Sequence, residues 1–218
     1  LTTMLFGIFL SAFFLGVKQN KKNVCILLGG GAVSGLFFLI CNTVFGSLFT
    51  EAVYPIFVHL PLFLLLVFYY RFRWLPSIIS IMTAYLCCQF SNWAGIFALS
   101  LSGLDWVYYL VRIIVTVAVF AFLSRYLCQT TALLLAKSDR ELYILGAMPF
   151  VYYVFDYSTT KFSMLLYSGN KVVVEFLAFA MCISYVIFLF VYFQEYELKY
   201  RAEHYGQLTY IQLSSLHS

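Results

Sequence analysis

The chain has 218 residues, of which 63% are hydrophobic and only 10% are charged, and its formal net charge is +4 at pH 7. A typical soluble domain is about 25% charged, so this composition excludes an ordinary soluble domain and predicts a membrane protein. The net positive charge does not indicate nucleic-acid binding, because the cations are spread over several gaps between apolar runs, where membrane topology explains them.

The apolar runs, taken in chain order, predict an all-α transmembrane helical bundle. A length of 218 residues suits about seven spans of about 20 residues with short connections. The sixth run is short for a bilayer, and residues 131–136 could lead into it as a tilted or interfacial segment. The first run begins on Leu rather than Met, so we expect the true N-terminus to be missing. The runs cover residues 1–17, 24–45, 52–70, 77–99, 106–123, 142–155 and 172–193.

The cations predict the direction in which the chain crosses the membrane. Ten of the 13 Lys and Arg residues occupy every second gap between the runs. Cytoplasmic loops collect Lys and Arg because cationic segments next to a span resist translocation. The pattern therefore predicts an N-terminus outside and a C-terminus inside. The ten residues are Lys18, Lys21, Lys22, Arg71, Arg73, Arg125, Lys137, Arg140, Lys199 and Arg201.

The second run carries a nearly side-chain-free surface, in which Gly31 and Gly35 have the GxxxG spacing. Such a surface lets another helix approach closely, so that van der Waals contact holds the pair together within the membrane. The sequence leaves open whether the partner helix belongs to the same chain or to another subunit.

The membrane interior offers few groups for chemistry. All nine acidic residues lie at run ends or in loops, and the six cysteines form no CxxC pair. Proton-coupled carriers and intramembrane metal enzymes usually need carboxylates or histidines deep in the bilayer. This pattern argues against an intramembrane hydrolase and, less strongly, against an ion-coupled transporter. We expect no metal and no cofactor.

Two ionisable residues are predicted to lie a little inside the outer surface. His59 is about two turns into the third run, and Arg112 is about two turns into the fifth, past Asp105. The functional interpretation is an outward-facing pocket that receives an acidic or carboxylate-bearing ligand. The alternative is a snorkelling arginine, or one paired with Asp105 or Glu51, together with a hydrogen-bonded core histidine.

The longest outer connection, residues 156–170, mixes the charges of Asp156 and Lys161 with hydroxyl and apolar side chains. A short interfacial helix would account for this mixture. We expect the loop and the outer mouth to form the extracellular recognition surface. The candidate outer-face ligand residues are thus His59, Asp105, Arg112, Asp156 and Lys161.

The composition changes after the seventh run, which divides the chain into a membrane domain, residues 1–193, and a cytoplasmic signalling helix, residues 194–218. The pairs Glu195–Lys199 and Glu197–Arg201 have the favourable i,i+4 order for a helix. An apolar stripe on this helix predicts a seam for a partner, with a second copy of the chain as the expected one. The candidate transmission residues are Lys171, Glu175, Leu198, Tyr205 and Leu208.

Three stretches carry a family likeness: SDRELYILGAMPFVYYVFDYSTT, LLYSGNKVVVEFLAF and YFQEYELKYRAEH. With its polytopic domain that runs straight into a charged helix, the chain resembles the input region of bacterial GHKL-type sensor histidine kinases, among them the peptide-pheromone receptor kinases. The resemblance implies a two-component receptor in the bacterial cytoplasmic membrane. It transfers no catalytic residue, because His204 and His217 lack the acceptor context and the ATP-binding boxes are absent.

The resulting hypothesis is a sensor domain that receives an extracellular or membrane signal and transmits it through the last span, with no enzymatic activity of its own. The alternative is a small polytopic transporter or permease component. The expected partners are the lipid bilayer, a second copy of the chain and a small or peptide ligand. A response regulator would bind only through a kinase core, and nucleic acid is not expected.

Overall fold

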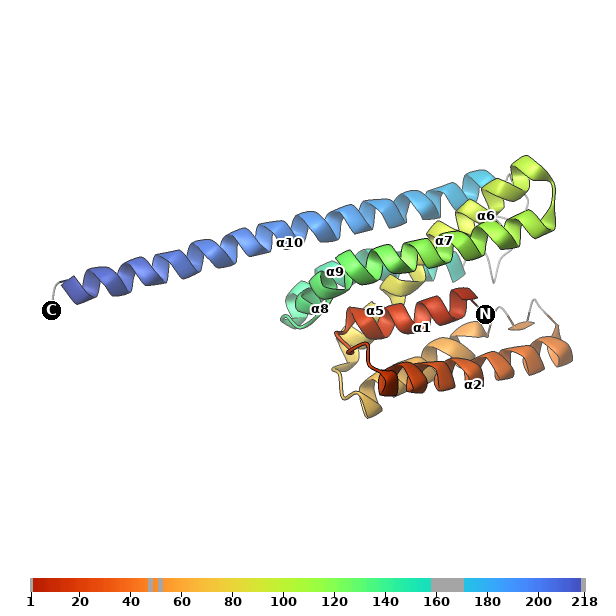
Figure 1. The fold of residues 1–218 in the computed structure, drawn as a ribbon, viewed down its shortest axis with the longest axis horizontal. Helices are drawn as coiled ribbons and strands as arrows, with labels where there is room; N and C mark the ends of the chain where they lie inside the picture. Colours follow the sequence, from red (N-terminus) through yellow and green to blue (C-terminus); the bar gives the residue numbers. More distant parts are fainter. Residues whose placement is uncertain (1, 47–48, 51–52, 158–170, 217–218) are drawn as a thin grey trace.

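The computed structural model describes residues 2–46, 49–50, 53–157 and 171–216 (Figure 1). All regular elements within these ranges are helical, which confirms the predicted all-α class. In chain order the elements are α1 (Thr2–Phe14), α2 (Lys21–Phe45), η1 (Pro55–His59), α4 (Leu60–Leu64), η2 (Leu65–Tyr69), α5 (Trp74–Cys87), α6 (Gln89–Ser102), α7 (Asp105–Tyr126), α8 (Cys128–Leu135), α9 (Asp139–Asp156) and α10 (Lys171–Leu216).

The membrane character of the chain is confirmed at the level of helix length and composition. Within the described residues, four helical segments are long and apolar enough to cross a membrane: Lys21–Phe45, Trp74–Ser102, Asp105–Tyr126 and Phe176–Lys199. Two further segments, in the first and third predicted spans, are apolar but shorter. The sixth predicted span, α9, has acidic residues in its first turn and at its last residue. The count of seven spans and their orientation therefore stay predictions.

Helix α1 lies at the centre of the bundle. It packs against α2, α5, α7 and α8, and Figure 1 shows it between α7 and α2. Its buried side chains lie on all sides of the helix axis, with Phe6 and Phe14 on one side and Ile8 and Ala12 on the opposite one. A helix that is apolar on every side is typical of a buried position. Its 13 residues extend for about 20 Å, less than the thickness of the hydrocarbon layer.

The GxxxG surface of α2 is packed within the chain. Gly31 and Gly35 are buried, and a Cβ atom at Gly31 would lie 2.7 Å from Cδ2 of Leu5 in α1. The helix that meets Gly31 is therefore α1 of the same chain. Gly29 and Gly30 have nothing within 4 Å of an added Cβ. Exposed apolar side chains cover the rest of α2, as expected for a helix surface in contact with lipid.

The third predicted span is not a regular α-helix. In η1 the N–H of Leu60 bonds to the carbonyl of Pro55, five residues earlier, which is the π-helical pattern. Pro61 has no N–H, and its ring crowds the carbonyl four residues before it, so the regular ladder is interrupted here. His59 ends this π-helical turn, a kind of distortion often found at functional sites.

The fourth predicted span divides at Cys88 into α5 and α6. Gly103 then ends α6 in the left-handed conformation, with φ of 68°, and its N–H bonds to the carbonyl of Leu99. This turn sends α7 back along α6. Gly95 permits the close approach of the two helices, since a Cβ there would lie only 3.0 Å from the ring of Tyr108.

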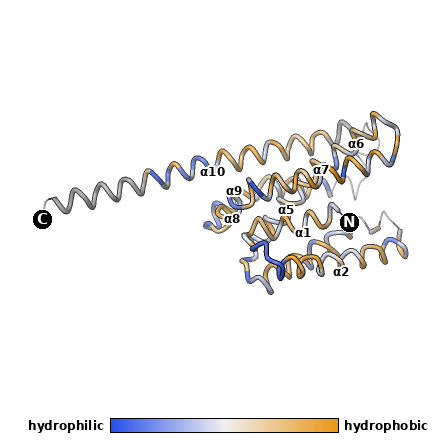
Figure 2. The backbone as a smooth tube through the Cα atoms, viewed as in Figure 1, coloured by the Kyte–Doolittle hydropathy of each residue, from blue (hydrophilic) through white to orange (hydrophobic). Residues whose placement is uncertain are grey.

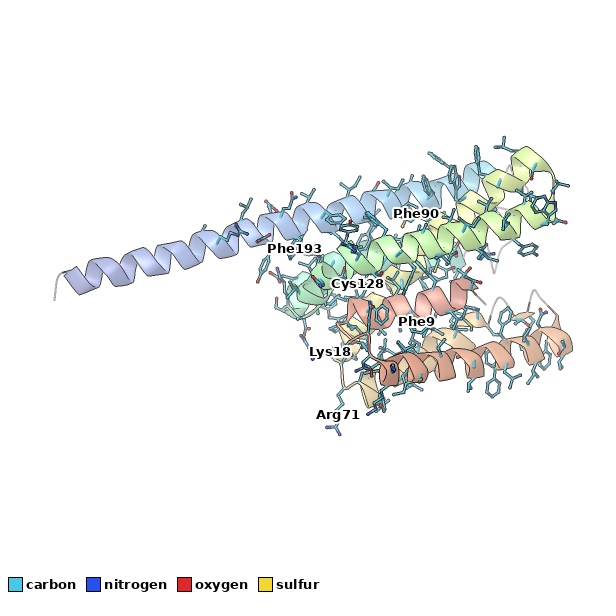
Figure 3. The ribbon with its side chains drawn as sticks, in the orientation of Figure 1. Phe9, Lys18, Arg71, Phe90, Cys128 and Phe193 are labelled. Carbon is cyan, nitrogen blue, oxygen red and sulfur yellow. The ribbon has the colours of Figure 1, made fainter. Side chains whose placement is uncertain are left out.

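Cationic residues gather at one end of the bundle, which we call the cationic end. Lys18 and Arg71 lie there together in Figure 3. Arg73, at the start of α5, donates to the carbonyl of Lys137 at 3.1 Å and pairs with Asp139 at the start of α9. Figure 2 shows hydrophilic residues at the same end, next to α8 and α9. The gaps that the sequence assigned to one side of the membrane thus lie side by side.

Helix α10 begins at the opposite end of the bundle and continues well beyond the cationic end (Figure 1). It packs against α6 first and also contacts α5, α8 and α9. Its 46 residues extend for about 69 Å, more than twice the hydrocarbon thickness. The predicted continuation of the seventh run as a helix is confirmed.

Candidate functional site

A cavity of about 640 Å³ lies in the half of the bundle away from the cationic end. Its walls come from α1, α2, η1, α4, α5, α6, α7 and α9, together with Tyr54 and Tyr157 just outside them. Three of the predicted outer-face residues, His59, Arg112 and Asp156, line it. Asp105 is not among the lining residues, and Lys161 lies outside the described residues.

Among the described residues, Arg112 is the cation that lines this cavity, and the hydroxyl to which it donates is neutral. Its Nη1 donates to the hydroxyl of Tyr108 at 2.6 Å, and the guanidinium carbon lies 5.6 Å from the centre of that ring. Its Nε is buried without a hydrogen-bond partner among the described residues. In the same part of the chain no carboxylate forms an ion pair with Arg112, so the predicted pairing with Asp105 is not formed. Glu51 lies outside the described residues.

His59 is hydrogen-bonded, as expected from the alternative interpretation of this residue as a core histidine. Its Nδ1 lies 2.8 Å from the hydroxyl of Tyr153. The rings of Tyr54 and Tyr85 meet the imidazole edge-on, with centroids 5.2 and 5.7 Å away. A ring held from three sides is fixed in orientation, so it can present its remaining nitrogen in one direction.

Within the described part of the chain, Asp156 is the carboxylate that lines the cavity, and it is the last residue of α9. A negative charge is unfavourable there, because the carbonyl end of a helix carries a partial negative charge. The hydroxyl of Tyr85 donates to Asp156 Oδ2 and offsets this cost. The ring of Tyr85 also meets that of Tyr153 edge-on and that of Tyr157 at a tilt, so α5 and α9 share one aromatic cluster.

The cavity changes character along its length. On α1 it extends from Thr2 to Ser11, about 13 Å of helix. The charged side chains lie towards the end away from the cationic gaps, whereas Ile8, Leu62 and Ile81 lie deeper. The deep hydroxyls of Ser11 and Thr116 donate to carbonyls of their own helices. The site therefore combines a polar mouth with a largely apolar interior, which is the usual arrangement of a small-molecule pocket.

Sequence reasoning missed Tyr185, which ties α10 to the rest of the bundle. This side chain is 2% exposed, and its hydroxyl donates to the carbonyl of Leu145 in α9 at 2.9 Å. Leu145 is four residues before Pro149, which has no N–H to donate to that carbonyl. Tyr185 therefore supplies the donor that the proline lacks. Its hydroxyl also lies 3.4 Å from Thr83 Oγ1 of α5.

A second contact of α10 was also missed, at the cationic end. Lys137 lies between α8 and α9, its side chain is 9% exposed, and its Nζ sits 3.0 Å from the ring centre of Tyr196 in α10. Tyr192 is 5.4 Å away and Glu141 Oε2 is 3.6 Å away. Burial lowers the pKa of the Lys137 ammonium, and the Glu141 carboxylate opposes that shift. We call Lys137 with these two tyrosines the inner clamp.

The structure describes the side chain of one of the five predicted transmission residues, Leu198. Leu198 is exposed, as a seam residue without a bound partner would be. Of the two predicted i,i+4 pairs, the one between Glu197 and Arg201 is present, with Oε1 2.5 Å from Nη2. The side chains outside the described part are those of Lys171, Glu175, Tyr205 and Leu208.

Comparison of the chain with protein-family models, with curated proteins and with solved structures finds no match. Among the described residues, no group of three or more His, Cys, Asp or Glu side chains is placed to hold a metal ion. The functional argument therefore starts from the cavity and from the contacts of α10.

Proposed function

We propose that this chain is the membrane-embedded receptor portion of a signalling protein. A ligand in the cavity changes the packing of α10, and α10 carries that change into the cytoplasm. The observation that carries the proposal is the buried bond of Tyr185, because it joins the cavity-lining helices to the long helix that leaves the bundle.

The connection between cavity and output helix is short. Tyr85 lines the cavity, and Thr83, on the same helix, faces Tyr185 of α10. Asp156 ends α9, the helix whose carbonyl at Leu145 accepts from Tyr185. A ligand that moves α5 or α9 therefore acts directly on the bond that holds α10. Packed helices change between discrete arrangements, which suits a switch of this kind.

The shape of α10 suits an output element. The helix is long enough to cross the bilayer and to project into the aqueous phase without a break. Its cationic-end contact, the inner clamp, lies where the helix leaves the bundle. Movement at Tyr185 would thus reach the cytoplasmic segment through one continuous rod.

Several features favour a receptor over a small transporter. Between the cavity and the cationic end, Phe14 and Leu66 are each 0% exposed and belong to one apolar core. A carrier would have to open this core in every cycle, whereas a receptor needs only a shift in helix packing. A carrier also has no requirement for the projecting half of α10.

The resemblance to GHKL-type sensor kinases supports the same function. In this proposal the cationic end faces the bacterial cytoplasm, as cation-rich loops do. The projecting part of α10 pairs with a second copy of the chain. A kinase core outside these 218 residues reads the arrangement of the pair and phosphorylates a response regulator, and the chain itself has no catalytic activity.

The proposal is tested in a hybrid that carries a histidine-kinase core fused in frame after Ser218, reconstituted in nanodiscs. Tyr185→Phe should change the basal autophosphorylation rate about fivefold or more, the usual size of a coupling between two sites. Lys199→Pro, which breaks α10 beyond the bundle, should abolish this effect, and Lys199→Ala should preserve it.

Tyr143→Phe is the matched control, since Tyr143 is an exposed tyrosine on α9. It should leave the rate unchanged. A Tyr185→Phe hybrid that folds normally and phosphorylates at the parental rate would refute the coupling. So would a Lys199→Pro hybrid that still responds to the Tyr185 substitution.

A further inference from the structure

The geometry points to an anionic amphiphile as the ligand of the cavity. We propose a molecule with one anionic head and a single apolar tail, which enters from the bilayer between α2 and α7. The inference rests on the proposed function for its signalling role, but its occupancy of the cavity can be measured separately.

The head is assigned from Arg112. This cation lies about 10 Å along α7 from Asp105, below the aromatic side chains that begin the helix. Its Nη1 is bound to a neutral hydroxyl, and its buried Nε has no hydrogen-bond partner among the described residues. An anionic head would supply the missing acceptor through a charge-assisted bond, which is strong where water is excluded.

Asp156 does not take this role, because Tyr85 donates to its carboxylate and the two residues belong to the α5–α9 contact. Since Asp156 also lines the cavity, the mouth holds both signs of charge. The cation is the one with an unused donor, and this difference favours an anion over a cation as the head.

The tail is assigned from the deeper lining. Ile8, Val58, Leu62 and Ile81 are buried and present aliphatic surface to the same cavity as Arg112. Its volume of about 640 Å³ is within the range of about 300–1,000 Å³ found for pockets that hold small organic ligands. A purely polar ligand would leave this apolar surface unused.

The path of entry is assigned from three residues that both line the cavity and are exposed on the outer surface of the bundle. Leu39 of α2 and Tyr109 and Ile113 of α7 all line the cavity, yet they are exposed by 51%, 62% and 47%. Both helices are candidate membrane spans, so the surface that these side chains expose faces acyl chains. Figure 1 shows α1 between the two helices. A ligand dissolved in the bilayer can therefore reach the cavity from the side.

The test uses the full chain in phosphatidylcholine nanodiscs and a dodecanoate that carries a photoreactive diazirine in its tail. Cross-links should map to α1, α2 and α7. Unlabelled dodecanoate should compete at least about tenfold better than dodecanol, which lacks the charge, and than butyrate, which lacks the tail. Equal competition by dodecanol would overturn the assignment of the head, and equal competition by butyrate that of the tail.

Variants locate the site. Arg112→Gln should weaken dodecanoate binding about tenfold, whereas Arg125→Gln, at the other end of α7, should not. Because Arg112→Gln could affect folding, Ile113→Trp provides a second variant that blocks the side entry and keeps the charge. Its control is Ile114→Trp, at an exposed neighbour that does not line the cavity. Equal binding in the two tryptophan variants would refute lateral entry.

Further arms separate the outcomes. Competition by lysophosphatidylglycerol, which has one acyl tail, would identify a membrane lipid as the source of the anionic amphiphile. The lack of such competition would indicate a molecule supplied from outside the membrane. If a peptide displaced the diazirine probe saturably and unlabelled dodecanoate did not, the inference would be overturned. If dodecanoate binds as expected but the kinase hybrid shows no change in autophosphorylation, the proposed function alone is refuted. If Tyr185→Phe changes autophosphorylation as expected but dodecanoate does not bind, the amphiphile proposal alone is refuted.

Discussion

Replacing Tyr185 by Phe tests how the bundle compensates for a proline in α9. The substitution keeps the ring and removes only the hydroxyl that donates to the carbonyl of Leu145 at 2.9 Å. Because Pro149 cannot donate to that carbonyl, the carbonyl would be left without a strong partner in a site that is almost fully buried.

The expected cost follows from this geometry. An unsatisfied buried carbonyl costs about 1–3 kcal/mol in soluble proteins, and side-chain hydrogen bonds within membranes average about 0.6 kcal/mol, with a maximum near 1.7 kcal/mol. Tyr185 is fully buried and its bond has normal length, so the upper part of the membrane range applies. Tyr185→Phe should lower the free energy of unfolding by about 1–2 kcal/mol.

A double-mutant cycle isolates the cause. Pro149→Ala restores a backbone N–H that can bond to the carbonyl of Leu145, so Tyr185→Phe should cost less in that background, with a coupling energy of about 1 kcal/mol. Unfolding by SDS in mixed micelles, followed by tryptophan fluorescence, provides the measurement. Tyr143→Phe, at an exposed site on α9, should stay within about 0.5 kcal/mol of the parent. If Tyr185→Phe costs the same in the parent and in the Pro149→Ala background, the reasoning is refuted.

Three further predictions concern packing, the inner clamp and topology. Gly146→Ala should destabilise the bundle by about 1–3 kcal/mol in the same unfolding assay, because its Cβ would lie 2.7 Å from Cγ1 of Ile79, whereas Gly29→Ala should be tolerated. Lys137→Met should lower the free energy of unfolding by about 1–2 kcal/mol, and Lys199→Met should change it little. In a Tyr196→Leu background the effect of Lys137→Met should largely vanish if the cation–π contact is its source. Reporter fusions should indicate the cytoplasm at one set of sites and the outside at the other, and two or more reversed fusions would contradict the predicted topology. The cytoplasmic set is Lys22, Arg73, Lys137 and Ser218, and the outer set is Phe49, Gly103 and Tyr167.

Features that depend on local sequence could be predicted. The apolar runs located α2 and α7 to within a few residues, because each has a recognisable boundary. The Asn20 side chain accepts from the N–H of Asn23 to cap α2, and Gly103 ends α6 directly before α7 begins. The charge pattern likewise predicted which gaps lie together. The convergence of His59, Arg112 and Asp156 on one cavity was anticipated only as a shared outer surface.

Features that depend on contacts between distant segments could not be predicted. The bond of Tyr185 joins residues 40 positions apart, and its reason becomes clear only when the carbonyl left free by Pro149 is seen to face α10. Lys137 was interpreted as a topology signal, although its ammonium is held against Tyr196. The π-helical turn at His59 also escaped prediction, because prolines in a run can equally produce a simple kink.

The central position of α1 has a consequence for the assembly of the protein. Helices α5, α7 and α8, which surround α1, are synthesised later, and α8 follows α1 by roughly 110 residues, or about 6–22 s of translation. Until α5 is synthesised, roughly 60 residues after α1, α2 is the one member of the set α2, α5, α7 and α8 that is present, and the rest of the apolar surface of α1 must be solvated by lipid. The core of this protein is thus completed by later helices closing around a segment that entered the membrane before them.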